Sequence, residues 1–401
     1  MNNFVAISTP TARELLADYH HQHPFFFATP ERTLLAQGHY ATVPQANNLQ
    51  ALSQLVDTAL KAALDAGHPN PIVVGAIPFD ADQMACLMIP QYLHQAGPLQ
   101  MQGEHSSSTA QGLVPNAHYH IEAEPAPQVY FDSVAEAVSR LKEKQLSKVV
   151  LARTLNLCCE DNIDIGYLLE RLASKNSSGY TFAVNLNGSD EGTLIGASPE
   201  LLLSRNGQQI RSHPLAGSAA RVPQDDEENA RRCAVLLSSL KDLHEHQVVA
   251  DAVTAGLRQF CTTLDVPEHP SIVSTATMWH LASDIRGVLN DSNASSLLLA
   301  AHLHPTPAVC GYPNQAARDL IRELEPFERG FYTGMVGWCD AQGNGEWVVT
   351  IRCAKVKDKQ LRLFAGAGVV ADSSPQSELA ETAAKFKTML NALGLAHEGV
   401  V

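Results

Sequence analysis

Two carboxylates and a lysine recur at helical spacing near the end of this 401-residue chain. Glu378, Glu381 and Lys385 stand at positions i, i+3 and i+7, after a Ser374-Pro375 pair that is typical of a helix N-terminus. On a helix the three side chains fall within about 60° of one another, so they share one face. Carboxylate oxygens with no Cys or His among them suit a hard cation such as Mg2+. A salt-bridged surface helix would give the same spacing.

Cationic and glycine-rich positions precede this helix. Apolar residues alternate through residues 347–353, which predicts one strand that carries Arg352 on one face. The next expected strand contains Gly366-Ala367-Gly368, whose backbone amides are free of bulky side chains. An anion could bind among Arg352, these amides and Lys385, because a guanidinium group recognises a carboxylate with two parallel hydrogen bonds. The plain alternative is a pair of strands without a ligand.

A lysine and a glutamate border other strand-like runs. Lys148 begins the run KVVLAR, so alternation could place its side chain in the interior beside Val150, where a desolvated lysine can act as a general base. The alternative is a strand end with its ammonium group in water. Glu200 stands between two expected strands, where a turn carboxylate is the plain interpretation. If Glu200 were buried and neutral near pH 7, it could donate a proton.

The histidine motifs argue against zinc. His244 and His246 flank Glu245 on an expected helix, where positions i and i+2 point to different faces. The metalloprotease pattern needs its histidines at i and i+4. His280 lies in an apolar run and is typical of a packed core histidine. Residues 304–311, HPTPAVCG, contain two prolines and a glycine and predict a rigid loop.

Charge and composition exclude several classes of protein. The net charge is −14 and the pI is about 5.6, so nucleic acid and anionic membranes are poor partners. No stretch approaches about 18 uninterrupted apolar residues, and the N-terminus lacks a basic segment followed by an apolar run, so neither a membrane span nor a signal peptide is expected. The eight cysteines show no CxxC spacing and suit reduced core thiols. We therefore expect a cytoplasmic protein.

Helix-like and strand-like segments alternate along the chain. The pattern predicts helices over residues 11–19, 49–66, 131–145 and 225–260, the last with a break near Ser239, and strands over 71–79, 148–153, 180–186, 192–197 and 201–205. Residues 96–128 are rich in Gly, Ser, Gln, Pro and His and predict a loop that crosses between two halves. The absence of a GxGxxG or phosphate-binding loop argues against nucleotide binding. Propensity alone leaves several α/β and α+β arrangements open.

Several of these motifs together resemble a known family. KVVLAR, SPE, HPLAGS, HEH, MWHL, HPTPAVCG and the C-terminal stretch resemble the chorismate-utilising enzymes, and within them the isochorismate synthases of siderophore pathways. The resemblance covers residues 131–395 and is much weaker before about residue 125. It implies an α+β fold in one large domain over 1–401, with two stacked antiparallel sheets, helices outside and the site between the sheets. Residues 1–128 would form a less typical N-terminal half, and residues 129–395 the half with the motifs and the active site.

The resemblance also implies roles for single residues. Lys148, which ammonia-using relatives lack, would be the base that activates water, and Glu200 would protonate the departing C4 hydroxyl. His280 would hydrogen-bond beside the substrate ring. The implied Mg2+ ligands are Glu245, Glu381 and, directly or through water, Glu378. The implied substrate-binding residues are Gly217, Ser218, Ala308, Val309, Tyr332, Ile351, Arg352, Phe364, Gly366, Ala367, Gly368 and Lys385.

The reaction implied by the resemblance is a Mg2+-dependent, reversible conversion of chorismate to isochorismate, for catechol siderophores built from 2,3-dihydroxybenzoate. A salicylate synthase would keep the same base and acid and then expel pyruvate, but Ala308 stands where such relatives commonly have Thr. An aminating enzyme would need ammonia from a glutaminase subunit, and Ala216 stands where aminodeoxychorismate synthases commonly have Lys. Menaquinone biosynthesis, a non-catalytic Mg2+- or carboxylate-binding module and an unrelated phosphoryl-transfer enzyme are further alternatives. The sequence leaves the oligomeric state open, with a monomer allowed.

Overall fold

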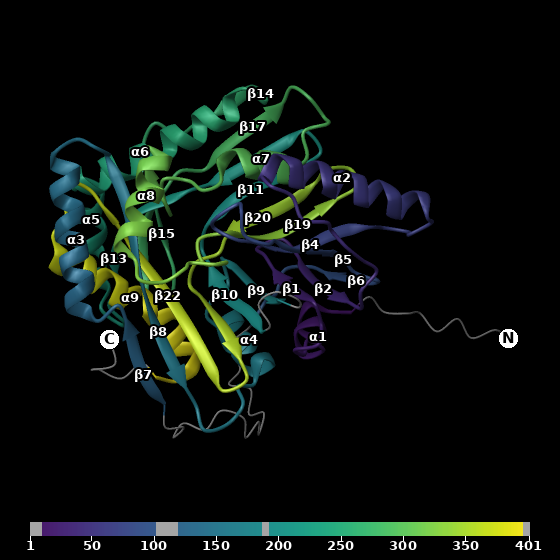
Figure 1. Cartoon of the computed structure of the whole chain (residues 1–401), viewed down its shortest axis with the longest axis horizontal. Helices are drawn as coiled ribbons and strands as arrows, with labels where there is room; N and C mark the ends of the chain where they lie inside the picture. The colour runs from purple at the N-terminus through teal and green to yellow at the C-terminus, as the bar shows by residue number, and fades with distance from the viewer. Residues whose placement is uncertain (1–9, 102–118, 187–191, 396–401) are drawn as a thin grey trace.

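The computed structural model describes residues 10–101, 119–186 and 192–395 (Figure 1). Two helix boundaries follow the predicted local signals: Pro375 is the first residue of α9, and Ser239 separates α5 from α6. Helix α3 begins at Pro127, four residues before the predicted start. The helices are α1 (Ala12–Ala17), α2 (Leu49–Asp65), α3 (Pro127–Lys142), α4 (Ile165–Ser174), α5 (Asp226–Ser238), α6 (Leu240–Arg258), α7 (Ser296–Leu303), α8 (Asn314–Leu324) and α9 (Pro375–Leu393).

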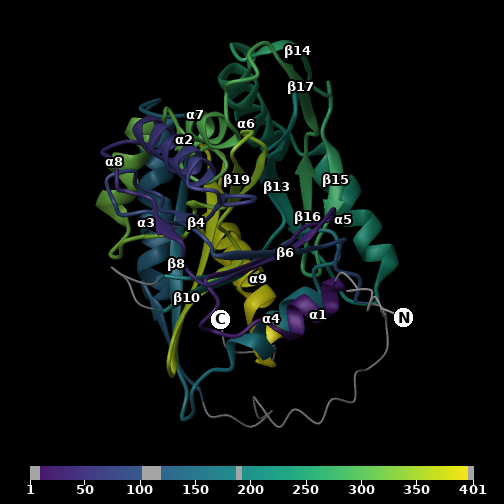
Figure 2. The same cartoon turned by 90° about the vertical axis from the view of Figure 1, so that its right-hand side faces the viewer.

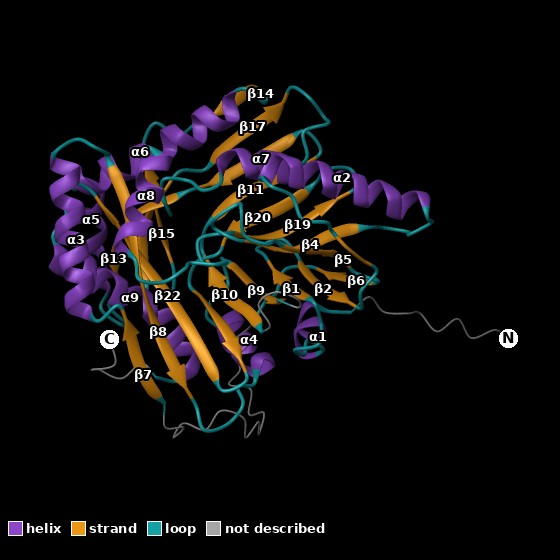
Figure 3. Ribbon diagram, in the orientation of Figure 1, coloured by secondary structure: helices purple, strands orange, loops and turns teal. Residues whose placement is uncertain are grey.

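The strands form two large antiparallel sheets and one small one (Figure 3). The ten-stranded sheet runs in the order β18 (Gly311–Tyr312), β8 (Lys148–Cys158), β22 (Gln360–Val369), β21 (Cys353–Lys357), β10 (Thr193–Ser198), β9 (Tyr180–Asn185), β1 (Phe25–Ala28), β2 (Thr33–Gln37) and β6 (Tyr92–Ala96), with β7 (His120–Glu124) also beside β8. The nine-stranded sheet runs β14 (Cys261–Asp265), β17 (Ile285–Leu289), β12 (Gln209–His213), β11 (Leu201–Asn206), β20 (Gly345–Val349), β19 (Met335–Asp340), β4 (Ile72–Ile77), β5 (Cys86–Ile89) and β3 (Ala41–Thr42). The small sheet is β13 (Leu215–Ala220), β16 (Met278–Ala282) and β15 (Ser271–Ser274).

The two large sheets pack face to face over an apolar core. Phe25 and Phe27 on β1 point into this core and meet Val336 and Val348 from the nine-stranded sheet. Phe26, between them, points to the opposite face, as the period of two requires. The predicted α+β fold with two stacked antiparallel sheets is therefore confirmed. The small third sheet was not predicted.

Helices cover the outer faces of both sheets. Helices α2, α6 and α7 pack on the nine-stranded sheet, and α1, α4 and α9 on the ten-stranded sheet (Figure 2). Helices α3 and α8 pack in a further apolar cluster with Val149 and Leu151 of β8. Each of the helices named here thus buries apolar side chains against a sheet. Among the described residues, no helix is long and apolar enough to cross a membrane.

The first hundred residues contribute to both large sheets. Strands β1, β2 and β6 extend the ten-stranded sheet beside β9, and β3, β4 and β5 extend the nine-stranded sheet beside β19. The loop predicted over 96–128 is wrong at β7, because pairing with β8 makes this polar segment a strand. Residues 102–118 of that loop lie outside the described residues.

The single strand predicted over residues 347–353 is also wrong. Strand β20 ends at Val349 in the nine-stranded sheet, and β21 begins at Cys353 in the ten-stranded sheet. Between them Arg352 has a φ of 51°, a left-handed conformation that disfavours a β-strand. The alternation could not reveal this crossing because the segment is apolar toward both sheets. The crossing turns the Arg352 side chain toward a pocket.

Candidate active site

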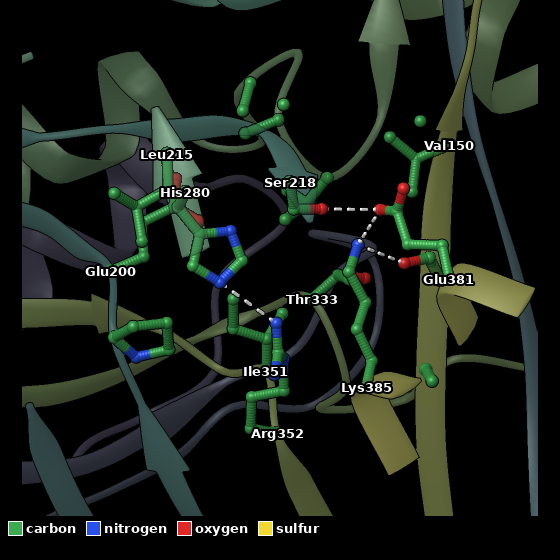
Figure 4. A pocket seen from close by; sticks show the side chains of 18 of the residues that line it. Val150, Glu200, Leu215, Ser218, His280, Thr333, Ile351, Arg352, Glu381 and Lys385 are labelled. Atoms are coloured by element: carbon green, nitrogen blue, oxygen red, sulfur yellow. Dashed lines mark hydrogen bonds and ion pairs between the residues drawn. The ribbon is translucent and has the colours of Figure 1, made fainter. Parts of the chain in front are cut away.

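A pocket forms where strands of the ten-stranded sheet and of the small sheet meet α6, α9 and the loop at 304–310 (Figure 4). It collects residues that lie more than two hundred positions apart in the sequence. Most of the predicted site residues line it. These are Glu200, Gly217, Ser218, Glu245, His280, Ala308, Val309, Tyr332, Ile351, Arg352, Phe364, Gly366, Gly368, Glu381 and Lys385.

Three predicted site residues do not line this pocket: Lys148, Ala367 and Glu378. Lys148 begins β8 with a fully buried side chain, so the alternative with its ammonium in water is wrong. Its Nζ lies 2.9 Å from Oε1 of Glu245, which does line the pocket. The contact is an ion pair without hydrogen-bond geometry, so Lys148 Nζ is a buried donor with no acceptor among the described residues.

The glycine run on β22 was predicted to offer backbone amides to an anion, and the structure gives it a different role. A methyl group on Gly368 would stand 2.2 Å from Oε1 of Glu245, and one on Gly366 would stand 2.8 Å from the Tyr332 hydroxyl. These glycines therefore make room for protein side chains. Gly366 presents its carbonyl to the pocket, where it accepts a hydrogen bond of 2.8 Å from Lys385. The alternation of β22 places the Ala367 side chain on the other face.

Each predicted metal ligand forms an ion pair with a lysine. The three nitrogen–oxygen distances are 2.9 Å for Lys148–Glu245, 2.6 Å for Lys241–Glu378 and 2.6 Å for Lys385–Glu381. Ser218 also donates a hydrogen bond of 2.9 Å to Glu381, visible with the Lys385 contact in Figure 4. The sequence analysis missed Lys241, although it precedes Glu245 by four residues on α6 and so shares its face.

The three carboxylates act on one another electrostatically. Burial and the charge of Glu381 raise the pKa of Glu378 to about 7. Burial acts to raise the pKa of Glu381 as well, but Lys385 and Ser218 hold it below its usual value. Burial acts to lower the pKa of Lys241, yet Glu378, Glu245 and Glu381 together raise it. The charges of Glu245, Glu378, Glu381 and Lys241 are therefore coupled to one another.

The residues fit a hard metal ion, although they are not arranged around one in this conformation. Within residues 10–101, 119–186 and 192–395, no three His, Cys, Asp or Glu side chains are placed to hold a metal. However, Glu378 Oε2 is buried and has no hydrogen-bond partner in the described part of the chain, and the donor set is three carboxylates. Carboxylate oxygens are the ligands that Mg2+ prefers. In this conformation the three lysines supply the positive charge that a bound cation would supply.

Glu200 supplies a protonatable carboxyl on another side of the pocket from Glu381 (Figure 4). It sits in the β10–β11 turn, where its N–H donates to the Ser198 hydroxyl at 3.2 Å and its carbonyl accepts from the N–H of Val349 at 3.1 Å. Burial raises the pKa of Glu200 to about 7, although the Leu215 N–H and the charges of Lys148 and Lys385 act against this rise. A turn carboxylate in water is therefore ruled out.

His280 and Arg352 form a buried pair beside Glu200. Arg352 donates from Nη2 to Nε2 of His280 at 3.2 Å (Figure 4). Burial, together with the charges of Arg352 and Lys385, holds the pKa of His280 well below its usual value. His280 is therefore a neutral imidazole that accepts at Nε2 and can donate from Nδ1. It is buried like a core histidine, yet it lines the pocket.

A second network, which the sequence analysis missed, supports the pocket wall. Arg329 donates to the carbonyls of Val309 and Val150, both at 2.7 Å, and forms a buried ion pair with Glu325. Glu325 in turn accepts from the N–H of Ala152. The spacing of Glu325 and Arg329, four positions, was the available signal, but it does not reveal which carbonyls the guanidinium meets.

The structure removes the zinc alternative at His244-Glu245-His246. His246 is buried, with Nδ1 3.2 Å from the Ala216 carbonyl and Nε2 2.8 Å from the Ser283 hydroxyl. His244 is exposed on another face of α6. The two imidazoles therefore cannot bind one ion, as the i, i+2 spacing predicted.

Residues 90–394 match a family model described as "Chorismate binding enzyme", and these residues contain the whole pocket. The chain belongs to the chorismate-binding enzyme family. The family resemblance inferred from the motifs is therefore confirmed.

Relatives in this family align along nearly the full chain. Isochorismate synthase DhbC of Bacillus subtilis is 50% identical over 398 residues, which cover 98% of each chain. Isochorismate synthase EntC of Escherichia coli is 43% identical over 381 residues, covering 92% of this chain and 95% of EntC. Among solved structures, a candidate 2,3-dihydroxybenzoate-specific isochorismate synthase, DhbC of Bacillus anthracis, aligns with a TM-score of 0.91 at 48% identity and covers 96% of this chain and 100% of that chain.

Proposed function

We propose that this member of the chorismate-binding family is an isochorismate synthase, which converts chorismate reversibly to isochorismate. The observation that carries the proposal is Glu200, a buried carboxyl with a pKa of about 7 in the same pocket as Arg352 and a lysine–carboxylate cluster. This combination supplies a proton donor and cations for a substrate that carries two carboxylates. The names of the relatives that align along nearly the whole chain support the same reaction.

The reaction needs one proton acceptor and one proton donor. In the proposed sequence, water forms a bond to C2 of the ring while Lys148 Nζ accepts a proton from it. The double bonds shift, the C4–O bond breaks, and Glu200 gives its proton to the leaving hydroxide, so that water departs. One water enters and one leaves. General acid and base groups of this kind each contribute about 10²–10⁴-fold.

Other side chains would orient the substrate. Arg352 suits a carboxylate because its guanidinium group can donate two parallel hydrogen bonds to the two oxygens. The neutral His280 accepts a hydrogen bond from Nη2 of Arg352 and so helps to orient the guanidinium group. Ala308 and the stacked rings of Tyr332 and Phe364, whose centroids lie 5.0 Å apart, give the ring an apolar wall. These contacts would fix the distance between the ring carbons and the two proton-transfer groups.

Glu245, Glu378 and Glu381 would hold Mg2+, and the buried oxygen of Glu378 without a partner supports this assignment. When bound, the ion would supply positive charge that neutralises a substrate carboxylate. This local charge matters because the whole chain has a net charge of −14 and would otherwise repel a dianion.

We assign the product to 2,3-dihydroxybenzoate formation for a catechol siderophore, because the description of the Bacillus anthracis relative names that compound. We further propose a cytoplasmic enzyme that uses chorismate and water without a glutaminase subunit. Its eight cysteines are free, which suits a reducing compartment.

The test is to incubate the purified protein with chorismate and Mg2+ and to separate the products by chromatography. We expect isochorismate as the product, with no turnover in excess EDTA. Salicylate and pyruvate in equal amounts would instead identify a salicylate synthase. Binding of chorismate without any turnover would identify a binding module.

A further inference from the structure

Lys241 differs from the other two lysines that pair with the carboxylates. Its Nζ lies 2.6 Å from Oε1 of Glu378, whose side chain is completely buried, while its own side chain is 26% exposed. The side chain of Lys148 is completely buried. Lys385 is also bound to the Gly366 carbonyl, so two acceptors fix it. Lys241 is thus the most exposed of the three.

Lys241 also faces a second space. It lines a surface groove between the start of α6 and the segment that follows α3, together with Leu240, His244, Tyr312 and Asp372. Neither Lys148 nor Lys385 lines this groove. Leu240, the first residue of α6, is 84% exposed, so the groove is open to solvent at this end. The Lys241 ammonium therefore has a direct path from the carboxylates to water.

A metal ion and this ammonium group compete for the same charge. A buried carboxylate is strongly destabilising unless a cation is paired with it, so Glu378 needs Lys241 while no metal is bound. Once a divalent cation binds Glu378, the ammonium 2.6 Å away is repelled by it. Lys148 is completely buried and Lys385 is held by two acceptors, and neither of them lines the groove.

We propose that Lys241 is a displaceable counter-ion, which holds Glu378 while the site is empty and moves into the groove when Mg2+ binds. The inference rests on the proposed Mg2+ site. Lys241 is a positioning residue, since it keeps the carboxylates in place and does not touch the reacting ring.

The direct test is chemical labelling of lysines in the wild-type protein. The protein is treated with an amine-acetylating reagent in EDTA and in saturating Mg2+ at matched ionic strength, and mass spectrometry of peptides gives the labelling rate of each lysine. Calorimetry on the same sample records whether Mg2+ binds. We expect Mg2+ to increase the labelling of Lys241 at least several-fold. Lys142, which lines the same groove, should label equally in both conditions.

Two contrary results are distinguishable. If calorimetry detects Mg2+ and isochorismate forms, but the labelling of Lys241 does not change, the counter-ion inference fails and the proposed function stands. If calorimetry detects no Mg2+, the metal part of the proposed function fails and the inference falls with it.

The variant Lys241→Met gives a second test that does not depend on activity. Without its counter-ion, Glu378 is uncompensated in the empty site, so the melting temperature in EDTA should fall and the rise on adding Mg2+ should exceed that of the wild type. Mg2+ affinity should increase by about tenfold, because the competing ammonium is gone. Lys142→Met removes the same charge from the same groove and should change neither quantity. Equal Mg2+ responses in Lys241→Met and wild type would overturn the inference.

Discussion

Burial of Glu200 leads to a pH dependence. Its carboxyl must be protonated to release hydroxide from C4, and its pKa is raised to about 7 by burial. We therefore expect kcat/KM for chorismate to fall as the pH rises above about 7. Glu200→Gln should lose about 10²–10⁴-fold in rate and should no longer show this limb of the profile. Steady-state rates across this range would check both expectations. A glutamine variant within tenfold of wild type would mean that another group is the acid.

The proposed role of Lys148 can be tested in both directions, because the reaction is reversible. From isochorismate to chorismate, Glu200 must take the proton and Lys148 must give it. A catalyst cannot shift the equilibrium, so Lys148→Ala should reduce both directions by the same factor, about 10²–10⁴-fold. Rates are measured both ways, and calorimetry checks that Mg2+ still binds, since Lys148 also pairs with Glu245. Near-normal turnover in both directions would place the base elsewhere.

At the scale of elements, Arg329 joins three segments that line the pocket. Its guanidinium binds the carbonyl of Val150 on β8 and that of Val309 in the loop at 304–310, and it contacts the hydroxyl of Thr333 before β19. The Glu325–Arg329 pair is almost completely buried. Breaking such a pair from one side typically costs about 3–5 kcal/mol, because the remaining charge is uncompensated.

We therefore expect Arg329→Met to lower the melting temperature strongly. Arg329→Lys should fold, but its pocket-lining segments should be held less firmly in place. A lysine cannot reproduce the fork that meets two carbonyls, so kcat should fall about tenfold or more while far-ultraviolet circular dichroism is unchanged. Arg318→Lys is the matched control. Arg318 also packs on the Phe79 ring but pairs with Asp80, away from the pocket. Equal losses of kcat in the two lysine variants would argue against a positioning role.

The elements also show what sequence could and could not predict. Helical spacing predicted the shared face of Glu381 and Lys385, and alternation allowed the buried Lys148. These features are local, so period and spacing determine them. Lys241 and Arg329 were missed because their partners come from other elements. The order of strands in each sheet and the crossing of the chain at Arg352 depend on tertiary pairing. No local period in the sequence encodes that pairing.

At the scale of the whole molecule, the motifs and the framework occupy different parts of the chain. The pocket residues all come after residue 148, yet strands from the first hundred residues extend both large sheets. Strand β1 covers the edge of β9, and β4 covers the edge of β19. The sequence division into residues 1–128 and 129–395 therefore follows the motifs and does not follow the sheets.

This topology predicts that residues 129–401 do not fold as a separate unit. Removal of the first part would leave β9 and β19 as long apolar edges and would expose the inter-sheet core, which contains Phe182, Val184 and Val336. We expect the fragment to be insoluble or to lack near-ultraviolet circular dichroism, whereas the full chain should be soluble with a cooperative thermal transition. Co-expression of residues 1–128 with the fragment should restore a soluble complex, because the same strands would again cover both edges. A soluble fragment with a cooperative thermal transition would show instead that the motif-bearing half is an independent domain.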